Sequence, residues 1–387
     1  MQKKRYLLGF LLLLIFVIFG CAAQEAPIEK ASGPVAEDAP QETIEEPVVA
    51  EEVPEQIEEK EETAGEIPPK KQTALAFSRK IKVADAVFPG IFFANDNFYV
   101  TYNKNNNAYI KKFDDNFKEI EEKKLTNVNK VNDIQVVYDN GFFYVVYSTP
   151  GKSGAPDKGM YLKKFDLDFN EVKSIAITEE APKTEATNDM FLSLIGDLLH
   201  VGTFYIPANP GPGNNFGHNI RVYDKDFNLK KEFAANDLNH QNGASLIFVN
   251  DKFTIVSGAN INFNNQNRDL ITLSYDKDWN FLNDGAISNE PDDEYWPMGS
   301  FFDKDTIYIA YISNEKFNPQ FCSTCDMGDI YLKRYGENFN LIDKTIVADE
   351  FPSQRPHLLK VGNKVYVAYD SSENNQLKIY VKEFAEQ

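Results

Sequence analysis

The final eight residues of the chain, YVKEFAEQ at positions 380–387, repeat a pattern that occurs five times earlier in the sequence. Each earlier copy continues into a turn and another apolar stretch, but the final copy has no such continuation. The six copies end at the aromatic residues Phe113, Phe165, Tyr223, Tyr275, Tyr335 and Phe384. Their spacing of roughly fifty to sixty residues predicts an internal structural repeat.

The pattern predicts four short antiparallel strands in each repeat. After the aromatic residue comes a turn rich in Asp, Asn or Gly, such as residues 114–117, and then a further strand. Before it lies a second hairpin with a turn of the same kind, such as residues 139–141. These residue types favour tight hairpins, and the 30 Phe and 19 Tyr favour half-buried strands. Six such repeats resemble an all-β fold, the six-bladed β-propeller with four-stranded antiparallel blades.

The sixth repeat has only three of the four strands. Residues 76–85, AFSRKIKVAD, precede the first full repeat and are left over. They are similar to residues 340–349, NLIDKTIVAD, which form the fourth strand of the fifth repeat. We therefore predict that the N-terminal strand completes the last blade and closes the ring, which removes the exposed edges of an open array.

The N-terminus has the features of an export signal. A basic start at residues 3–5 is followed by an apolar run of 13 residues at 7–19, too short for an ordinary membrane-spanning helix. The run ends at Gly20 and Cys21, and this segment resembles the lipobox of bacterial-type lipoproteins. The resemblance implies that residues 1–21 are a signal peptide and that Cys21 carries palmitate-type acyl chains. The protein would then be anchored to the cell membrane or outer envelope on the extracytoplasmic side. A plain secretory signal and an N-terminal anchor helix are the alternatives.

Residues 22–72 have the composition of a linker. They hold 15 Asp or Glu against 4 Lys and contain no aromatic residue, so we expect a disordered, extended segment. It would hold the predicted propeller at 73–387 away from a membrane, although an acidic partner-binding tail is an alternative. The propeller region is also acidic in a chain whose formal charge is −19. This argues against nucleic acid as a partner.

Long, unequal loops are predicted on one face of the propeller. Four insertions fall between the second and third strands of the middle blades, at residues 148–160, 206–218, 259–268 and 313–329. Variable loops on a rigid scaffold often carry binding sites, but neutral drift of surface loops would produce the same pattern. We predict that this loop-rich face binds a glycan or protein ligand.

The inner strands start at the same face, around the mouth of the central channel. Blades two to four place polar residues there, whereas blades five, six and one place a proline. The predicted ligand-binding residues are Asp133, Asp189, His240, Asn242, Glu294, Trp296, Arg355 and His357. Trp296 has no apparent counterpart in the repeat and is expected either to stack on a ligand such as a sugar ring or to cover the channel. Trp279 replaces a repeated Phe and is expected in the core.

A second function class centres on the channel itself. Asp133, Asp189, Asn242 and Glu294 carry the oxygen ligands that Ca²⁺ prefers. Their placement is similar to that in gluconolactonase-like hydrolases, six-bladed propellers that bind Ca²⁺ at inner-strand starts. This implies a Ca²⁺-assisted hydrolase or lyase, lactonase-like or glycosidase-like, as the alternative to a binding module. Caps on the inner strands, or groups that hold channel water, explain the same residues.

No catalytic residue is assigned, and a binding role is favoured over an enzymatic one. A glycosidase needs two carboxylates about 5 to 10 Å apart, and the sequence cannot give that distance. The nucleophile-elbow motif of Ser-His-Asp hydrolases is absent. The Ser-x-Asp-x-Gly-x-Thr box of sialidases is also absent.

Two short motifs have plainer explanations. Cys322 and Cys325 form a Cys-x-x-Cys pair, which suits a redox motif, half a zinc site or a local disulfide, and export favours the disulfide. Asp224, Asp226 and Asn228 have the spacing of the start of a calcium loop, without its Gly and distal Glu. Because the motif recurs at hairpins, turn formation is the preferred interpretation.

Overall fold

The computed structural model describes the propeller region, with gaps in its loops. The described residues are 74–126, 131, 133–149, 159–178, 185–205, 217–235, 240–259, 269–288, 290, 294–314 and 327–387. They all belong to one compact unit, Pro69–Gln387. The predicted signal, linker and Cys pair lie outside these residues. Within the described ranges, no helix has the length and apolar character that a membrane crossing requires.

The first four blades are four-stranded antiparallel sheets whose strands follow one another in chain order. Blade one holds β2 (Val87–Ala94), β3 (Asn97–Lys104), β4 (Asn107–Phe113) and β5 (Glu119–Lys124). Blade two holds β6 (Ile134–Asp139), β7 (Phe142–Thr149), β8 (Gly159–Asp166) and β9 (Glu171–Thr178). Blade three holds β10 (Glu185–Ile195), β11 (Leu198–Tyr205), β12 (Gly217–Asp224) and β13 (Leu229–Ala235). Blade four holds β14 (His240–Val249), β15 (Lys252–Ala259), β16 (Asp269–Tyr275) and β17 (Phe281–Ala286).

The last two blades share one long strand. Blade five holds β18 (Glu294–Asp303), β19 (Thr306–Ser313), β20 (Gly328–Gly336) and the first part of β21 (Leu341–Val361). Blade six holds the second part of β21, β22 (Lys364–Glu373), β23 (Gln376–Glu386) and β1 (Leu75–Ala84). The first part of β21 pairs with β20 and the second part with β22. The two blades therefore form one sheet of seven strands.

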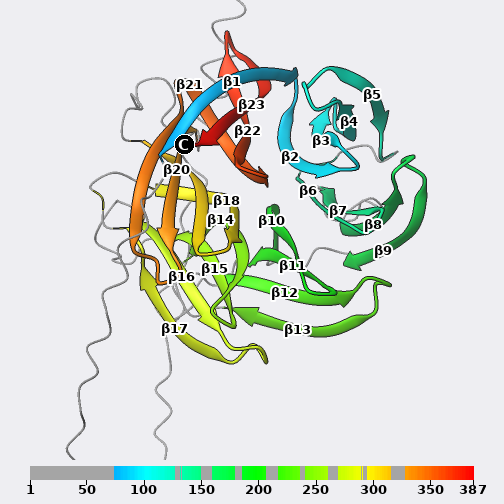
Figure 1. Ribbon diagram of the computed structural model, residues 1–387. Coiled ribbons are helices and arrows are strands. Elements are labelled where there is room, and N and C mark those ends of the chain that lie inside the picture. Colours follow the sequence, from blue (N-terminus) through cyan, green and yellow to red (C-terminus); the bar gives the residue numbers. More distant parts are fainter. Residues whose placement is uncertain are drawn as a thin grey trace, which may run out of the picture. The chain divides into compact units, whose positions relative to one another are not determined.

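The N-terminal strand completes the last blade, as the sequence predicts. β1 pairs antiparallel with β23, from Leu75 opposite Glu386 to Ala84 opposite Ile379. Figure 1 shows β1 passing beside β23 and reaching β2 of blade one. Blades six and one share an apolar cluster that includes Val83, Phe98 and Val381. The predicted arrangement of strands in six blades is confirmed.

The repeated turns are built by an aspartate and an aromatic residue. In blade three, Asp224 Oδ1 accepts hydrogen bonds from the backbone N–H groups of Asp226 and Asn228, both at 2.9 Å. Hydrogen bonds from Lys230 and Asn228 hold the pKa of Asp224 well below its usual value. The aromatic residue of each turn has a positive φ, between 59° and 63° in the five blades that have the turn. The interpretation of this motif as a turn is confirmed, and Trp279 is buried in the core as predicted.

Candidate functional site

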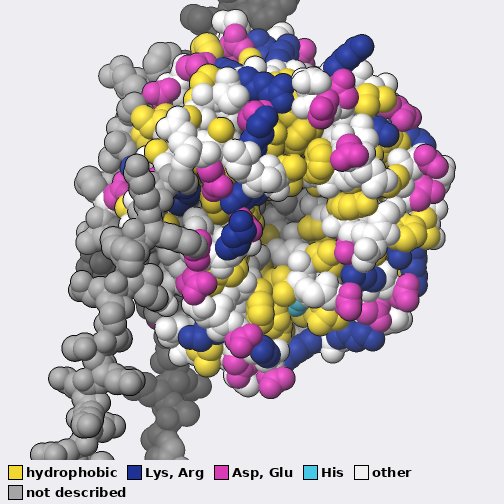
Figure 2. Space-filling model, viewed as in Figure 1, with side chains coloured by type: hydrophobic (Ala, Val, Ile, Leu, Met, Phe, Trp, Pro, Cys, Tyr) yellow, Lys and Arg dark blue, Asp and Glu magenta, His cyan; other side chains and the backbone are white. Residues whose placement is uncertain are grey.

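The central channel contains a cavity of about 400 Å³. Its wall takes residues from the innermost strand of every blade, namely β2, β6, β10, β14, β18 and the second part of β21. Figure 1 shows these inner strands grouped around the centre. Figure 2 shows a hollow there, with walls that are mainly hydrophobic or uncharged. This cavity is the candidate binding site.

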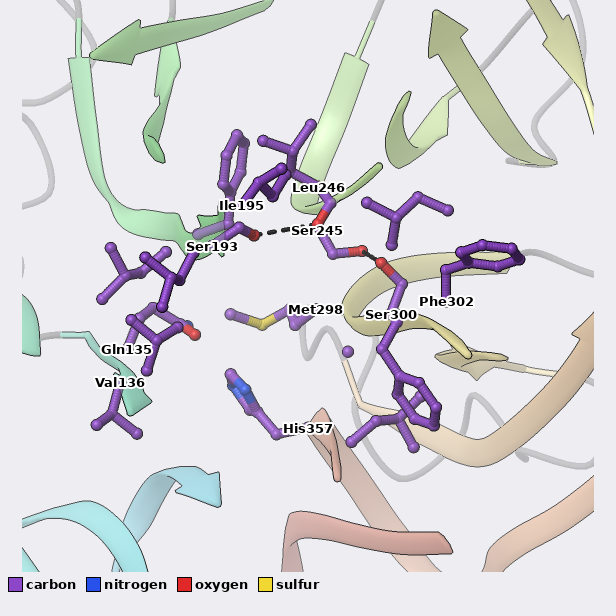
Figure 3. Close-up of a pocket in the computed structure, with 18 of the residues that line it drawn as sticks. Gln135, Val136, Ser193, Ile195, Ser245, Leu246, Met298, Ser300, Phe302 and His357 are labelled. Atoms are coloured by element: carbon purple, nitrogen blue, oxygen red, sulfur yellow. Dashed lines mark hydrogen bonds between the residues drawn. The ribbon is translucent and has the colours of Figure 1, made fainter. Parts of the chain in front are cut away.

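Serine hydroxyl groups form part of the cavity wall (Figure 3). Ser300 Oγ donates a hydrogen bond to Ser245 Oγ at 2.7 Å, and Ser245 Oγ donates in turn to the Pro297 carbonyl at 2.7 Å. Ser193 Oγ donates to the Leu246 carbonyl at 3.1 Å. Because the hydroxyl protons are engaged by the protein, the oxygens of Ser193 and Ser300 keep lone pairs that can accept hydrogen bonds from a ligand.

His357 supplies the imidazole of the site. Its ring points into the cavity, near Met298 and opposite the serine side (Figure 3). Burial lowers the pKa of His357 to about 4, so the ring is neutral at pH 7. A neutral imidazole offers one N–H donor and one nitrogen acceptor. His357 was predicted as a site residue from the sequence, and the structure places it in the channel wall.

The cavity wall carries no formal charge among the described residues. Its polar side chains are those of Gln135, Ser193, Ser245, Ser300 and His357, and no Asp, Glu, Lys or Arg lines it. The sequence analysis missed Gln135 and the three serines. The sequence feature that could have identified them is a polar residue within an otherwise apolar inner strand, such as Ser193 in MFLSLI.

Three residues near the starts of the inner strands of neighbouring blades share an unusual backbone conformation. Phe88, Trp296 and Arg355 each precede a proline, and their φ angles are 57°, 51° and 53°. The left-handed region is costly for bulky residues and is further disfavoured before proline. Each of the three residues lies at a register shift between the inner strand and its neighbour. The repeat therefore imposes the same local distortion on three different side chains.

These three side chains stack on one another. The Arg355 guanidinium lies 3.8 Å from the centre of the Phe88 ring and 5.4 Å from that of Trp296. Gly243, with a φ of +73°, packs so closely on Trp296 that an added Cβ would lie 2.9 Å from the Trp296 Cα. The expectation that Trp296 lacks a counterpart in the repeat was wrong, because Phe88 and Arg355 occupy the same place. Trp296 is only 7% exposed and packs in an apolar cluster of blades five and six. Both expected roles, stacking on a ligand and covering the channel, stay predictions.

Arg355 forms an ion pair within blade six, and a hydrogen bond from blade one reaches the same carboxylate. Its Nη1 donates to Asp370 Oδ2 at 3.0 Å, and the backbone N–H of Phe88 donates to the same oxygen at 3.2 Å. Asp370 is fully buried. Burial raises the pKa of Asp370, and the charge of Arg355 opposes that rise. The cation predicted at the channel mouth is therefore engaged within the protein.

The two described carboxylates of the predicted Ca²⁺ set have different protein partners. Asp133 Oδ2 accepts a hydrogen bond from the backbone N–H of Met190 in the next blade, at 3.1 Å. Glu294 Oε1 accepts one from Lys333 Nζ at 2.6 Å, and Lys333 also pairs with Glu290 at 2.7 Å. Asp133 and Glu294 are both fully buried.

The remaining predicted residues lie on inner strands, but their side chains are outside the description. Asp189 lies in β10, and His240 and Asn242 lie in β14. Among the described residues, no group of three His, Cys, Asp or Glu side chains is placed to hold a metal ion. The four-residue Ca²⁺ site stays a prediction.

Comparison with known proteins identifies the fold. No family model and no curated protein matches the chain. The solved structure of YjhT is similar, with a TM-score of 0.51 and 10% identity over 80% of this chain and 96% of that one. Trypanosoma rangeli sialidase in complex with the inhibitor DANA gives a TM-score of 0.53 and 11% identity over 77% of this chain. The match spans 54% of the sialidase chain, about half its length. The protein is a β-propeller, and at these identities the similarity establishes the fold alone.

Proposed function

We propose that the protein is a glycan-binding β-propeller anchored to a membrane through Cys21. The observation that carries this proposal is the uncharged channel wall, in which hydroxyl, amide and neutral imidazole groups alternate with apolar side chains. A sugar offers hydroxyl donors and acceptors together with apolar C–H faces. Ligand sites of this kind are concave, largely apolar and supplied with a few fixed polar groups.

The fold comparison supports a glycan as the ligand class. One of the similar solved structures is Trypanosoma rangeli sialidase in complex with sialic acid, with a TM-score of 0.52. In that protein a propeller of related fold holds a glycan component. The binding residues of this chain are its own, because the identity is 10%.

The side chains that line the cavity favour a binding role over catalysis. A glycosidase needs two carboxylic groups, and no Asp or Glu among the described residues lines the cavity. An efficient general base has a pKa near the working pH, whereas that of His357 is about 4. A channel-centred hydrolase or lyase, with or without Ca²⁺, is the second candidate because His357 faces the cavity.

The position of β1 suits anchoring at the N-terminus. β1 starts at Leu75, which pairs with Glu386 beside the tight turn at residues 362–363. It ends at Ala84, just before β2 begins at the loop-rich end. A chain tethered at Cys21 would thus enter the propeller at its tight-turn face and leave the opposite face free for a ligand. The acyl chains, each contributing about 0.8 kcal/mol per buried CH₂, would hold it there.

The glycan proposal is tested by binding of the full-length chain, purified in detergent, to a glycan array. We expect binding to a limited set of glycans. Changing His357→Phe should weaken it by roughly 10-fold or more, because a lost ligand hydrogen bond leaves a polar group unpaired. Ser193→Ala should weaken binding less, and the matched control Ser174→Ala, on the exposed outer strand β9, should leave it unchanged.

Two results would contradict this proposal. Absence of binding to every glycan on the array would remove the glycan ligand. Release of a cleaved product from a bound glycan would favour the hydrolase or lyase instead.

The anchor is tested separately with Cys21→Ser. We expect the variant to lose its acyl chains and to leave the membrane fraction, because the sulfur that carries the first chain is gone. Mass spectrometry of the N-terminal peptide and membrane fractionation measure the two effects. Unchanged partitioning of the variant would rule out the lipid anchor.

A further inference from the structure

Cations on the outer strands fasten neighbouring blades together at the tight-turn face. In each case a Lys or Arg of one blade donates to a backbone carbonyl in the aspartate-type turn of the next blade. The bonds run from Arg79 to Asn116 at 3.1 Å, from Lys123 to Asp168 at 2.9 Å, from Lys173 to Asp226 at 2.5 Å, and from Lys231 to Asp278. The acceptor is always the residue just before the aromatic residue of the turn.

We define a cation socket as the turn carbonyl together with the ring of the aromatic residue that follows it. The aromatic ring is the second contact of the cation. Arg79 lies 5.2 Å from the centre of the Phe117 ring, Lys123 lies 5.6 Å from that of Phe169, and Lys173 lies 6.0 Å from that of Phe227. The rings of these sockets and of the socket in blade four are buried. Cation–π attraction and a charge-assisted hydrogen bond thus act on the same cation.

Blade five has a turn with the same backbone hydrogen bonds, in which Gly336 replaces the aspartate, and no cation among the described residues donates to its socket carbonyl. Its ring belongs to Phe339, whose φ of 59° matches those of the other turns. In blade four, Asn283 of β17 pairs with Ser274 of β16. Asn283 therefore has the register position that Lys231 has on β13 and Lys173 has on β9. Asn283 is a short neutral residue. Accordingly, Phe339 is only partly buried, and within the described residues no cation lies over its ring.

A groove of about 400 Å³ opens at this socket, between blades four and five. Blade four contributes Thr254, Ser274 and Asp284 to its walls, and blade five contributes Glu337 and Phe339. Lys252 also lines the groove. Asn250 Nδ2 donates to the Glu337 carbonyl at 3.2 Å, but no described group donates to the carbonyl of Asn338, the socket acceptor. The corresponding groove between blades six and one contains Arg79.

We propose that the socket between blades four and five binds an ammonium or guanidinium group from outside the chain, carried by a lysine or arginine side chain of a partner protein. The groove offers the contacts that the other sockets give to the chain's own cations, namely an aromatic ring and a free turn carbonyl. Asp284 and Glu337 add negative charge at its walls. The net charge of −19 favours the approach of a basic partner.

The socket is tested by nuclear magnetic resonance on the ¹⁵N-labelled full chain. The probes are N-acetyl-arginine amide and N-acetyl-lysine amide, with N-acetyl-glutamine amide as the neutral control. We expect saturable shifts of the backbone amides at residues 283–285 and 337–339 with both cations and none with the glutamine compound. Putrescine, a free diamine, distinguishes a free amine from a cation carried by a protein side chain. Shifts at the socket with putrescine but not with the arginine or lysine compound would assign the socket to free amines and would overturn the partner-protein proposal.

A substitution that fills the socket gives an independent test. Asn283→Lys should abolish the arginine-induced shifts and raise the melting temperature by about 1 to 3 °C, because it supplies the missing cation. Ser174→Lys adds the same charge on the outer strand of blade two and should change neither quantity. Unchanged arginine binding by Asn283→Lys, or shifts confined to other regions, would overturn the proposal. Shifts of the same amides by neutral sugars alone would assign the ring of Phe339 to glycan stacking instead.

Discussion

The junctions between blades six and one and between blades four and five differ at their tight-turn ends. Both have a groove there, of about 440 Å³ at the first and about 400 Å³ at the second. Arg79 supplies a cation to the first groove, over the ring of Phe117, whereas the matching position of the second is the neutral Asn283. One repeat unit can therefore use its outer-strand cation to hold the next blade or leave the same position available to a partner.

The largest effect is expected from removing β1, the strand that completes blade six. Deleting residues 73–85 exposes the edge of β23 and removes Ile81 and Val83 from the apolar cluster shared with blade one. At about 1.5 to 3 kcal/mol per buried side chain, we expect the free energy of unfolding to fall by about 3 to 6 kcal/mol, with a clear fall in melting temperature.

The matched control for that deletion is removal of residues 22–72, the predicted acidic linker. It should leave the melting temperature of the propeller unchanged, because no packed strand is lost. Differential scanning calorimetry of both truncations makes the comparison. Equal melting temperatures would contradict the role of β1 in holding blades six and one together.

The fold was predictable because its signals are local. Each turn is encoded by a few consecutive residues. The aromatic residue three positions after Asp224 or Asp276 marks the same position in the five blades that have this turn. The resemblance of residues 76–85 to the outer strand of blade five was enough to place β1. Strand pairing then followed from the order of the repeats.

The site was less predictable because its geometry depends on contacts between distant residues. Asp133 is engaged by Met190, and Glu294 by Lys333, and neither partner is adjacent in sequence. The common position of Phe88, Trp296 and Arg355 was hidden because the three residues differ chemically and share only a register shift and the proline that follows.

The next largest effect is expected from Arg355→Ala, which breaks the buried ion pair of blade six. Asp370 would remain as a buried carboxylate without its cation, and such a loss typically costs about 3 to 5 kcal/mol. Urea denaturation at pH 7 measures the free energy of unfolding. A fall in the free energy of unfolding of less than about 1 kcal/mol would show that the pair does not stabilise the fold.

The pH dependence of the same variant follows from the raised pKa of Asp370. A carboxyl group whose pKa is higher in the folded state stabilises that state when protonated, and this contribution is lost as the pH rises through the folded pKa. Removing Arg355 removes a charge that opposes the rise. The difference in unfolding free energy between wild type and Arg355→Ala should therefore shrink from pH 7 toward pH 5. A difference that grows over that range would contradict the assignment.

In blade five, Glu294→Gln should have a smaller effect. Lys333 is 1% exposed but keeps Glu290 as a second carboxylate partner at 2.7 Å. The amide oxygen of Gln can still accept the hydrogen bond from Lys333. We expect the free energy of unfolding to fall by about 1 to 2 kcal/mol at pH 7, measured by urea denaturation. A loss equal to that of Arg355→Ala would mean that Glu290 does not share the charge of Lys333.

The smallest effect is expected at the tight-turn ends, from Arg79→Met and its matched control Asn283→Met. Arg79→Met removes the cation over Phe117, while Glu383 keeps its ion pair with Lys364 at 2.8 Å. Because the side chain of Arg79 is 32% exposed, the free energy of unfolding should fall by only about 0.5 to 1 kcal/mol. This difference should diminish at high salt. Asn283→Met, at the same register position, removes no cation and should leave the melting temperature unchanged. If both variants lost the same stability, the cation of Arg79 would not distinguish the two grooves in the way that this comparison requires.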